Sequence, residues 1–475
     1  MIVENNLDKK FEYQGMWWIP YDPGMKLPGK LIYDPYEGSS LELIGTIDCL
    51  LNSPRKIEYN LILGISAEGK EITLFNNYIK RKQISTPGLV TYSYIVSRIF
   101  IGAHFQRLED IKFNNMYIHY LYLDEWVNIS GFEKINNILD EREIIIKYKS
   151  PAPIQAFVND KLKISINFVT SRPALPFIHK EVTIKQSTFL KVEPSKSILY
   201  EEFRNLINLF QNFLSLALRI PVYPTATFGE ISTERLNTKE NYKSKLVEIY
   251  SCFSESFRKK KPAYPYDDVL FNFNDISDEF ESYIQNWYNK QDNLKSVYSL
   301  YFGTLYNPQM YLENQFLNLI QAIESYHRYS NKITYVSDEE YAKLYDTILS
   351  SIPRDTNSEL KDRLNEYLKY GNEFSLRKRL KEIFKKHSEN IDLFVPDKKS
   401  FIDTVVNTRN FYTHHDNKIK GRAVTGEDLI KMNQILRMCI ELLLMTEIGF
   451  KSEHINAIIR ESRSFSNLNY GSPIL

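Results

Sequence analysis

The stretch Leu162-Lys-Ile-Ser-Ile-Asn-Phe168 alternates apolar and polar side chains. Because successive residues of a strand point to opposite faces of a sheet, this alternation predicts a strand with one buried and one hydrated face. The same period marks residues 116–122 and 182–185, and Ala67-Glu-Gly-Lys70 is typical of a hairpin turn. We therefore expect an antiparallel β-rich domain over residues 1–195, arranged as a sandwich.

Beyond Pro194 the hydrophobic period changes from that of a strand to that of a helix. An apolar stripe at helical spacing runs from Phe203 to Ala217 and ends ahead of Pro221. The residues that follow mix proline and aromatic side chains with short helical patterns. We expect residues 196–306 to form a mostly helical connector.

The last third of the chain carries repeated helix signals. Asn307-Pro308 is typical of a helix start, with proline at the first helical position. Polar residues suited to cap later helices precede each apolar stripe: Ser337, Ser375, Asp397 and Thr425. An all-helical bundle is expected over residues 307–475, so the predicted fold class is α+β.

The stretch that is richest in chemistry is Arg409-Asn-Phe-Tyr-Thr-His414. The helix that begins at Asp397 should reach about Thr413, which places Asn410 and His414 on one face. Arginine presents a planar fork of donors suited to phosphate, and histidine exchanges protons near neutral pH. Such a set suits RNA cleavage without a metal, in which the ribose 2′-hydroxyl attacks the adjacent phosphate.

That reaction needs both a proton acceptor and a proton donor, and one histidine alone would have to serve in both roles. Two motifs facing each other across a two-fold dimer would supply the second. His415 is an alternative to His414, and Asp416 is a further candidate. The non-catalytic alternative is that Arg409 pairs with a carboxylate of the bundle and His414 only caps the helix C-terminus.

A second polar group lies in Ile323-Glu-Ser-Tyr-His-Arg328. Helical spacing puts Glu324, His327 and Arg328 on one flank, where the carboxylate could orient a catalytic side chain of a neighbouring helix. The alternative is an ordinary pair of Glu324 with Arg328, worth about 0.2–0.5 kcal/mol.

A basic helix is expected after Ser375. Its outward side chains are expected to be Arg377, Lys378, Arg379, Lys381, Lys385 and Lys386. Five of these, all but Lys381, are candidates for binding the RNA backbone, and a merely solvated helix face is the alternative.

Composition and motifs exclude several classes of function. The net charge is +1, and the cysteines Cys49, Cys252 and Cys439 have no metal-ligand spacing. Phosphate-binding glycine loops, dinucleotide turns and zinc-protease motifs do not occur, so neither a cofactor nor a metal is expected. The N-terminus has no signal-peptide layout and no apolar run is long enough for a bilayer, which predicts a cytoplasmic protein without membrane contact.

Two stretches together, Ile323–Arg328 and Thr408–Asp416, resemble the HEPN domain of the ApeA family of bacterial anti-phage proteins. Gly15-Met-Trp-Trp-Ile-Pro20, followed by Gly29-Lys-Leu-Ile-Tyr33, resembles the N-terminal domain of that family. The resemblance thus touches both ends of the chain.

The resemblance implies a metal-independent endoribonuclease that works as a homodimer with a composite site. Arg409, Asn410 and His414 match the Arg-Asn-x-x-x-His motif of the family, and Glu324 matches its acidic position. The family further implies RNA, with tRNA expected, as substrate, a toxin-like role in abortive infection, and a phage-derived trigger at the β-rich domain. The alternative is a non-catalytic RNA-binding or protein-interaction scaffold.

Overall fold

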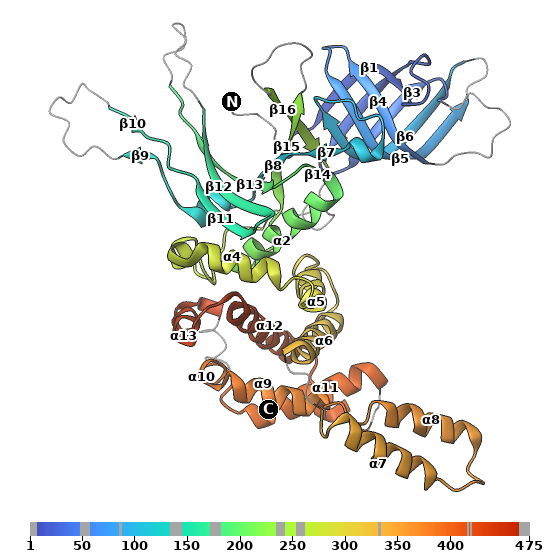
Figure 1. Ribbon diagram of the computed structural model, residues 1–475, viewed down its shortest axis with the longest axis vertical. Coiled ribbons are helices and arrows are strands. Elements are labelled where there is room, and N and C mark those ends of the chain that lie inside the picture. Colours follow the sequence, from blue (N-terminus) through green and yellow to red (C-terminus); the bar gives the residue numbers. More distant parts are fainter. Residues whose placement is uncertain are drawn as a thin grey trace. The chain divides into compact units, whose positions relative to one another are not determined.

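The computed structural model describes residues 7–47, 58–84, 88–133, 145–171, 182–233, 243–252, 262–330, 334–415, 418 and 420–464. Two compact units make up the chain, Met1–Tyr288 and Asn289–Leu475. The first is rich in antiparallel strands and the second is helical, which confirms the predicted α+β class (Figure 1).

Six strands of the first unit close into a barrel. They are β1 (Phe11–Trp18), β2 (Leu27–Asp34), β3 (Gly38–Ile44), β4 (Glu58–Ser66), β5 (Glu71–Ile84) and β6 (Val90–Ile101). Their order is β6-β3-β2-β1-β4-β5, and β5 pairs back with β6. The expected sandwich is therefore wrong, because β5 is long enough to pair with β4 along one edge and β6 along the other. Trp17, Leu31 and Tyr94 fill the barrel core.

The same sheet continues from β6 away from the barrel. The order is β11-β12-β13-β8-β15-β16-β6. The bounds are β8 (Asn115–Tyr120), β11 (Ile154–Asn159), β12 (Leu162–Thr170), β13 (Gln186–Pro194), β15 (Pro224–Thr233) and β16 (Lys243–Tyr250). Short pairs are formed by β7 (Lys112–Phe113) with β14 (Ile198–Leu199) and by β9 (Phe132–Glu133) with β10 (Lys147–Tyr148).

The strand predicted at residues 162–168 is present as β12, and the one predicted at 116–122 is present as β8 only as far as Tyr120, because Tyr122 adopts a left-handed φ of 63°. The turn at residues 67–70 joins β4 to β5, with Gly69 at a left-handed φ of 80°. The strand expected at 182–185 is wrong, because β13 begins only at Gln186. The backbone of Lys185 instead bonds to Ser171.

Helix α2 (Tyr200–Leu218) carries the apolar stripe predicted from Phe203 to Ala217, and it packs on β8 and β13. The other helical segments of this unit are α1 (Leu123–Val127), η1 (Leu108–Asp110), η2 (Asn274–Glu279) and α4 (Phe280–Asn289), which ends one residue beyond it. Residues 196–306 thus contain α2 and α4 and, in addition, two central strands of the large sheet.

The second unit is a helical bundle. Its helices are α5 (Lys295–Leu305), α6 (Leu312–Ser330), α7 (Asp338–Ser350), α8 (Ser358–Lys369), α9 (Leu376–Lys386), α10 (Ser388–Ile391), α11 (Lys398–His414), η3 (Lys420–Arg422), α12 (Gly426–Ile448) and α13 (Ser452–Glu461). Helix α6 contacts α5, α9, α11 and α12. Helix α12 is buried around most of its circumference, so it forms the centre of this core.

Three of the predicted caps form. The side chains of Ser337, Ser375 and Asp397 each accept a hydrogen bond from the backbone N–H three residues later. Thr425 is the residue before α12, but its side chain makes no capping hydrogen bond. The helix start expected at Asn307 is wrong: residues 307–310 form a turn and α6 begins at Leu312.

Helices α7 and α8 form a hairpin that extends from the other helices of its unit (Figure 1). Neither helix contains a buried residue. Across the described residues, no helix is long and apolar enough to cross a membrane.

Candidate active site

Helix α11 carries the Arg409–His414 motif. Phe401, Ile402, Val405 and Thr408 form its buried face. Arg409 and Asn410 follow in the next turn and are half-buried, whereas His414 is exposed at the last helical position. A guanidinium N–H of Arg409 donates to the Asn410 Oδ1 at 3.4 Å, so the two side chains of the motif lie in contact.

The end of α11 is fixed by its return segment. The hydroxyl oxygen of Thr408 accepts from the Val424 N–H at 3.1 Å, and the Tyr412 hydroxyl donates to the Val424 carbonyl at 3.1 Å. His415 ends the helix in the left-handed region, with φ of 50°, and its N–H donates to the Phe411 carbonyl. These contacts fix the C-terminal turn of α11, on which His414 lies.

His414 and His415 are both exposed. The ring of His415 lies 6.3 Å from that of Phe411, whereas His414 makes no hydrogen bond within the described residues. In the same part of the chain Arg409 forms no ion pair with a carboxylate, and His414 lies in the last turn of α11, where the non-catalytic role at the helix C-terminus would also place it. Asp416 lies outside the described residues.

A polar groove of about 500 Å³ lies beside α11. Its lining residues are Asp397, Lys399, Ser400, Asp403, Thr404, Asn407, Gly421 and Arg422. Asn407, Asn410 and His414 are spaced by three and four residues, so the helix stripe that borders the groove continues into the motif. The same spacing is visible in the sequence. Only the fold shows that η3 contacts α11 and forms the groove with it.

Glu324 and His327 lie on α6. The imidazole of His327 is fully buried: Arg379 donates to its Nδ1 at 3.3 Å and its Nε2–H donates to Glu382 at 3.1 Å. Burial is the main cause that lowers the pKa of His327, and the nearby Arg379 adds to it. His327 is therefore neutral at neutral pH and is held inside the bundle.

Arg379 is only 4% exposed, so its expected outward orientation is wrong. Its Nε donates to the Phe374 carbonyl at 2.8 Å, and its second terminal nitrogen donates to Glu373 at 3.0 Å. These acceptors, with His327, satisfy the guanidinium inside the bundle. Arg328 also pairs with Glu373, at 3.1 Å, rather than with an acid of its own helix.

Glu324 is half-buried and forms no hydrogen bond or ion pair within the described residues. Its negative charge nevertheless raises the pKa of Arg379, which burial lowers more strongly. The structure therefore associates Glu324 with the Arg379 group, and no hydrogen bond joins it to Arg409 or His414 among the described residues.

The remaining basic residues of α9 differ in exposure. Lys381, Lys385 and Lys386 face solvent, whereas Arg377 and Lys378 are half-buried. Arg377 pairs with Asp403 of α11, and Lys378 pairs with Glu382 at 3.3 Å. Among the described residues, no group of three or more histidine, cysteine or acidic side chains is placed to hold a metal ion.

Two family models match the chain. One, described as ApeA N-terminal domain 1, matches residues 12–287, and the other, described as Apea-like HEPN, matches residues 317–454. The second match includes all of α11 and the part of α6 from Leu317 onward, which carries Glu324 and His327. No curated protein and no solved structure matches the chain.

Proposed function

Because this chain belongs to the ApeA family and has a C-terminal HEPN domain, we propose that it is an endoribonuclease of anti-phage defence. The observation that supports this proposal is the arrangement on α11. Arg409 and Asn410 lie in contact, one turn before an exposed His414, on the helix whose preceding turns line a polar groove.

The proposed reaction needs no metal. The ribose 2′-hydroxyl loses its proton to a histidine and forms a bond to phosphorus, while the bond from phosphorus to the 5′-oxygen breaks. The departing 5′-oxygen takes up a proton, so the products carry a 2′,3′-cyclic phosphate and a 5′-hydroxyl. Arg409 stabilises the charge on the phosphate, His414 transfers protons and Asn410 orients Arg409.

A second chain would complete the site. Since a single catalytic histidine must otherwise give and accept protons in turn, we place two copies of α11 opposite each other in a homodimer. Glu324 would act as a positioning residue through Arg379, which joins α6 to α9. His415, and Asp416 beyond the described residues, remain secondary candidates.

RNA would approach over exposed positive charge. Lys385 and Lys386, with Lys381, can contact the phosphate backbone, whereas Arg377 and Lys378 already have acidic partners. In the groove, Arg422 and Asn407 offer a cation and an amide to the nucleotide next to the cleaved bond. A tRNA substrate and abortive infection are part of the proposal on the strength of the family resemblance.

The test compares wild type with His414→Ala and His415→Ala in the presence of EDTA, with a tRNA pool as substrate and end-group analysis of the products. We expect cleavage by wild type and His415→Ala, and a loss of at least about 100-fold for His414→Ala. Equal thermal stability of the three proteins is the control. Cleavage that needs a divalent ion, or that survives His414→Ala, would contradict the mechanism.

A scaffold is the second candidate function, and the α7–α8 hairpin favours it. Several apolar side chains of the hairpin and its flank are exposed: Leu344, Ile348, Leu360, Leu364, Tyr367 and Tyr370. Exposed apolar surface of this extent is typical of an interaction site. In that case the wild-type protein binds RNA or a protein partner without cleaving RNA, and His414→Ala leaves the binding unchanged.

A further inference from the structure

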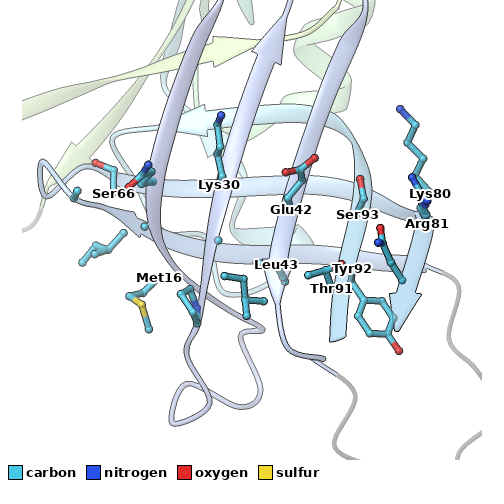
Figure 2. Close-up of a pocket in the computed structure, with 18 residues that line it drawn as sticks. Met16, Lys30, Glu42, Leu43, Ser66, Lys80, Arg81, Thr91, Tyr92 and Ser93 are labelled. Carbon is cyan, nitrogen blue, oxygen red and sulfur yellow. The ribbon is translucent and has the colours of Figure 1, made fainter. Parts of the chain in front are cut away.

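A groove of about 960 Å³ crosses the β1–β6 barrel (Figure 2). The exposed residues that line it, such as Met16 and Glu42, alternate along their strands with the buried residues Trp17 and Leu41 of the core. The groove therefore lies on the face that is turned away from the barrel core.

A polar row follows the groove from strand to strand. The sheet register pairs Gln14 with Lys30, Lys30 with Glu42, Glu42 with Ser93, and Ser93 with Arg81. Figure 2 shows four of these residues in that order, from Lys30 to Arg81. Five strands at their usual spacing give the row a length of about 19 Å.

A second row of side chains lies beside the polar row, two residues away along each strand, and its members on β4, β1 and β3 are apolar. Ile65 pairs with Met16, and Met16 pairs with Pro28. Ile44 follows across β3, where it pairs with Thr91. The side chains of Ile65, Met16 and Ile44 are all exposed, so the floor of the groove is hydrophobic from β4 as far as β3.

The opposite end of the groove is cationic because of a β-bulge. The register of β5 against β6 shifts between Ile79 and Arg81, and Lys80 is the extra residue. A bulge re-aims side chains that would otherwise alternate, and both Lys80 and Arg81 line the groove. Both are exposed, and neither forms an ion pair within the described residues, whereas Lys30 is paired with Glu12 at 2.6 Å.

The closed barrel restricts how a ligand can bind here. Each of the six strands is paired on both sides, so no free edge is available for strand addition. A ligand must lie across the strands and bond to side chains. The polar row suits the amide groups of a peptide backbone, whereas an acyl chain would leave those polar groups without partners.

We propose that this groove binds an extended acidic-apolar peptide segment of a partner protein. About six residues span 19 Å at the rise of an extended chain. An acidic side chain at one end lies on Lys80 and Arg81, and apolar side chains along the rest of the segment lie on Ile44, then Met16 and Ile65. Binding at this site does not depend on nuclease activity.

The first experiment probes the full-length protein with an array of immobilised seven-residue peptides that differ in acidic and apolar content. The best binder is then labelled with fluorescein and titrated by fluorescence polarisation. We expect the bound peptides to combine an acidic residue with apolar residues several positions away. Binding of no peptide, or of basic peptides, overturns the proposal.

Variants then locate the site. Lys80→Glu with Arg81→Glu on β5, and separately Met16→Glu on β1, should each weaken binding at least about tenfold, since they change opposite ends of the groove. Lys161→Glu, an exposed lysine of the same unit outside the groove, should bind like wild type. Equal binding by all variants overturns the proposal. The proposal is also overturned if RNA or an anionic detergent displaces the labelled peptide at a lower concentration than the unlabelled peptide does.

Discussion

Arg379 shows how a single buried cation can organise the helical unit. Its guanidinium donates to a backbone carbonyl, to His327 and to Glu373, so α6, α9 and the segment between α8 and α9 meet at one side chain. A buried charge costs several kcal/mol unless such partners compensate it. Removal of Arg379 would leave its acceptors without donors inside the bundle.

Arg379→Met should therefore lower the free energy of unfolding by about 3 kcal/mol, measured by urea denaturation of the full chain. The matched control is Lys385→Met on the exposed face of the same helix, with an expected change below about 0.5 kcal/mol. If Arg379→Met weakened RNA binding at unchanged stability, Arg379 would be a direct RNA contact after all.

The sequence predicted the basic character of α9 but not which cation is buried. Arg379 and Lys385 are both basic residues beside the apolar stripe, and the helical period treats them alike. What distinguishes them is the position of acceptors on another helix, such as His327. The place of the Arg409–His414 motif at the end of a helix was predicted correctly because all its residues lie within one local stretch, and its catalytic role stays a prediction.

At the scale of elements, most local signals predicted the right structure, whereas the long-range pairing of strands was not predicted. The caps at Ser337, Ser375 and Asp397 depend on contacts over three residues, and they form. Strand β16 was not foreseen, because it pairs with β6, about 150 residues earlier in the chain. Asn307-Pro308 failed as a helix start because the same residue types also favour turns.

The junction of α9 and α10 contains a buried histidine that should make the helical unit sensitive to acid. Burial, with the adjacent Lys386, lowers the pKa of His387 to about 4. The unfolded chain, with an ordinary histidine pKa of about 6.5, takes up the proton first. The contribution of neutral His387 to the free energy of unfolding is therefore fully present above a pH of about 6.5 and is lost as the pH falls toward 4.

Preferential protonation of His387 in the unfolded chain should by itself lower the free energy of unfolding by roughly 2 kcal/mol between pH 7.5 and pH 5. His387→Gln, which cannot take up a proton, should lose less stability over the same range. The measurement is urea denaturation of both proteins at the two pH values. A parallel loss in both proteins would mean that other groups cause the acid sensitivity.

At the scale of the whole molecule, each chain contributes one copy of the motif on α11. If one histidine from each of two chains is needed for the two proton transfers, only a dimer of two intact chains can cleave RNA. When wild type is co-expressed with an equal amount of His414→Ala, the two kinds of chain would pair at random, and only the dimers with two intact motifs would be active.

An equal mixture should retain about one quarter of the wild-type activity per total protein, because about one pair in four has two intact motifs. Differently tagged copies allow the pair composition to be verified, and RNA cleavage is the readout. Retention of about one half of the activity would show that each chain acts alone.

The pairing of β16 with β6 also has a consequence for translation. The β-rich unit extends to Tyr288, whereas α11 begins at Lys398, about 110 residues later. At about 5–20 residues per second, the ribosome takes roughly 5–20 s to cover that distance, and N-terminal domains fold first during synthesis. Each nascent chain thus has time to complete its barrel and sheet before it contains His414. A prematurely terminated chain that ends before α11 therefore lacks all the proposed catalytic residues of that helix, even when its β-rich unit is complete.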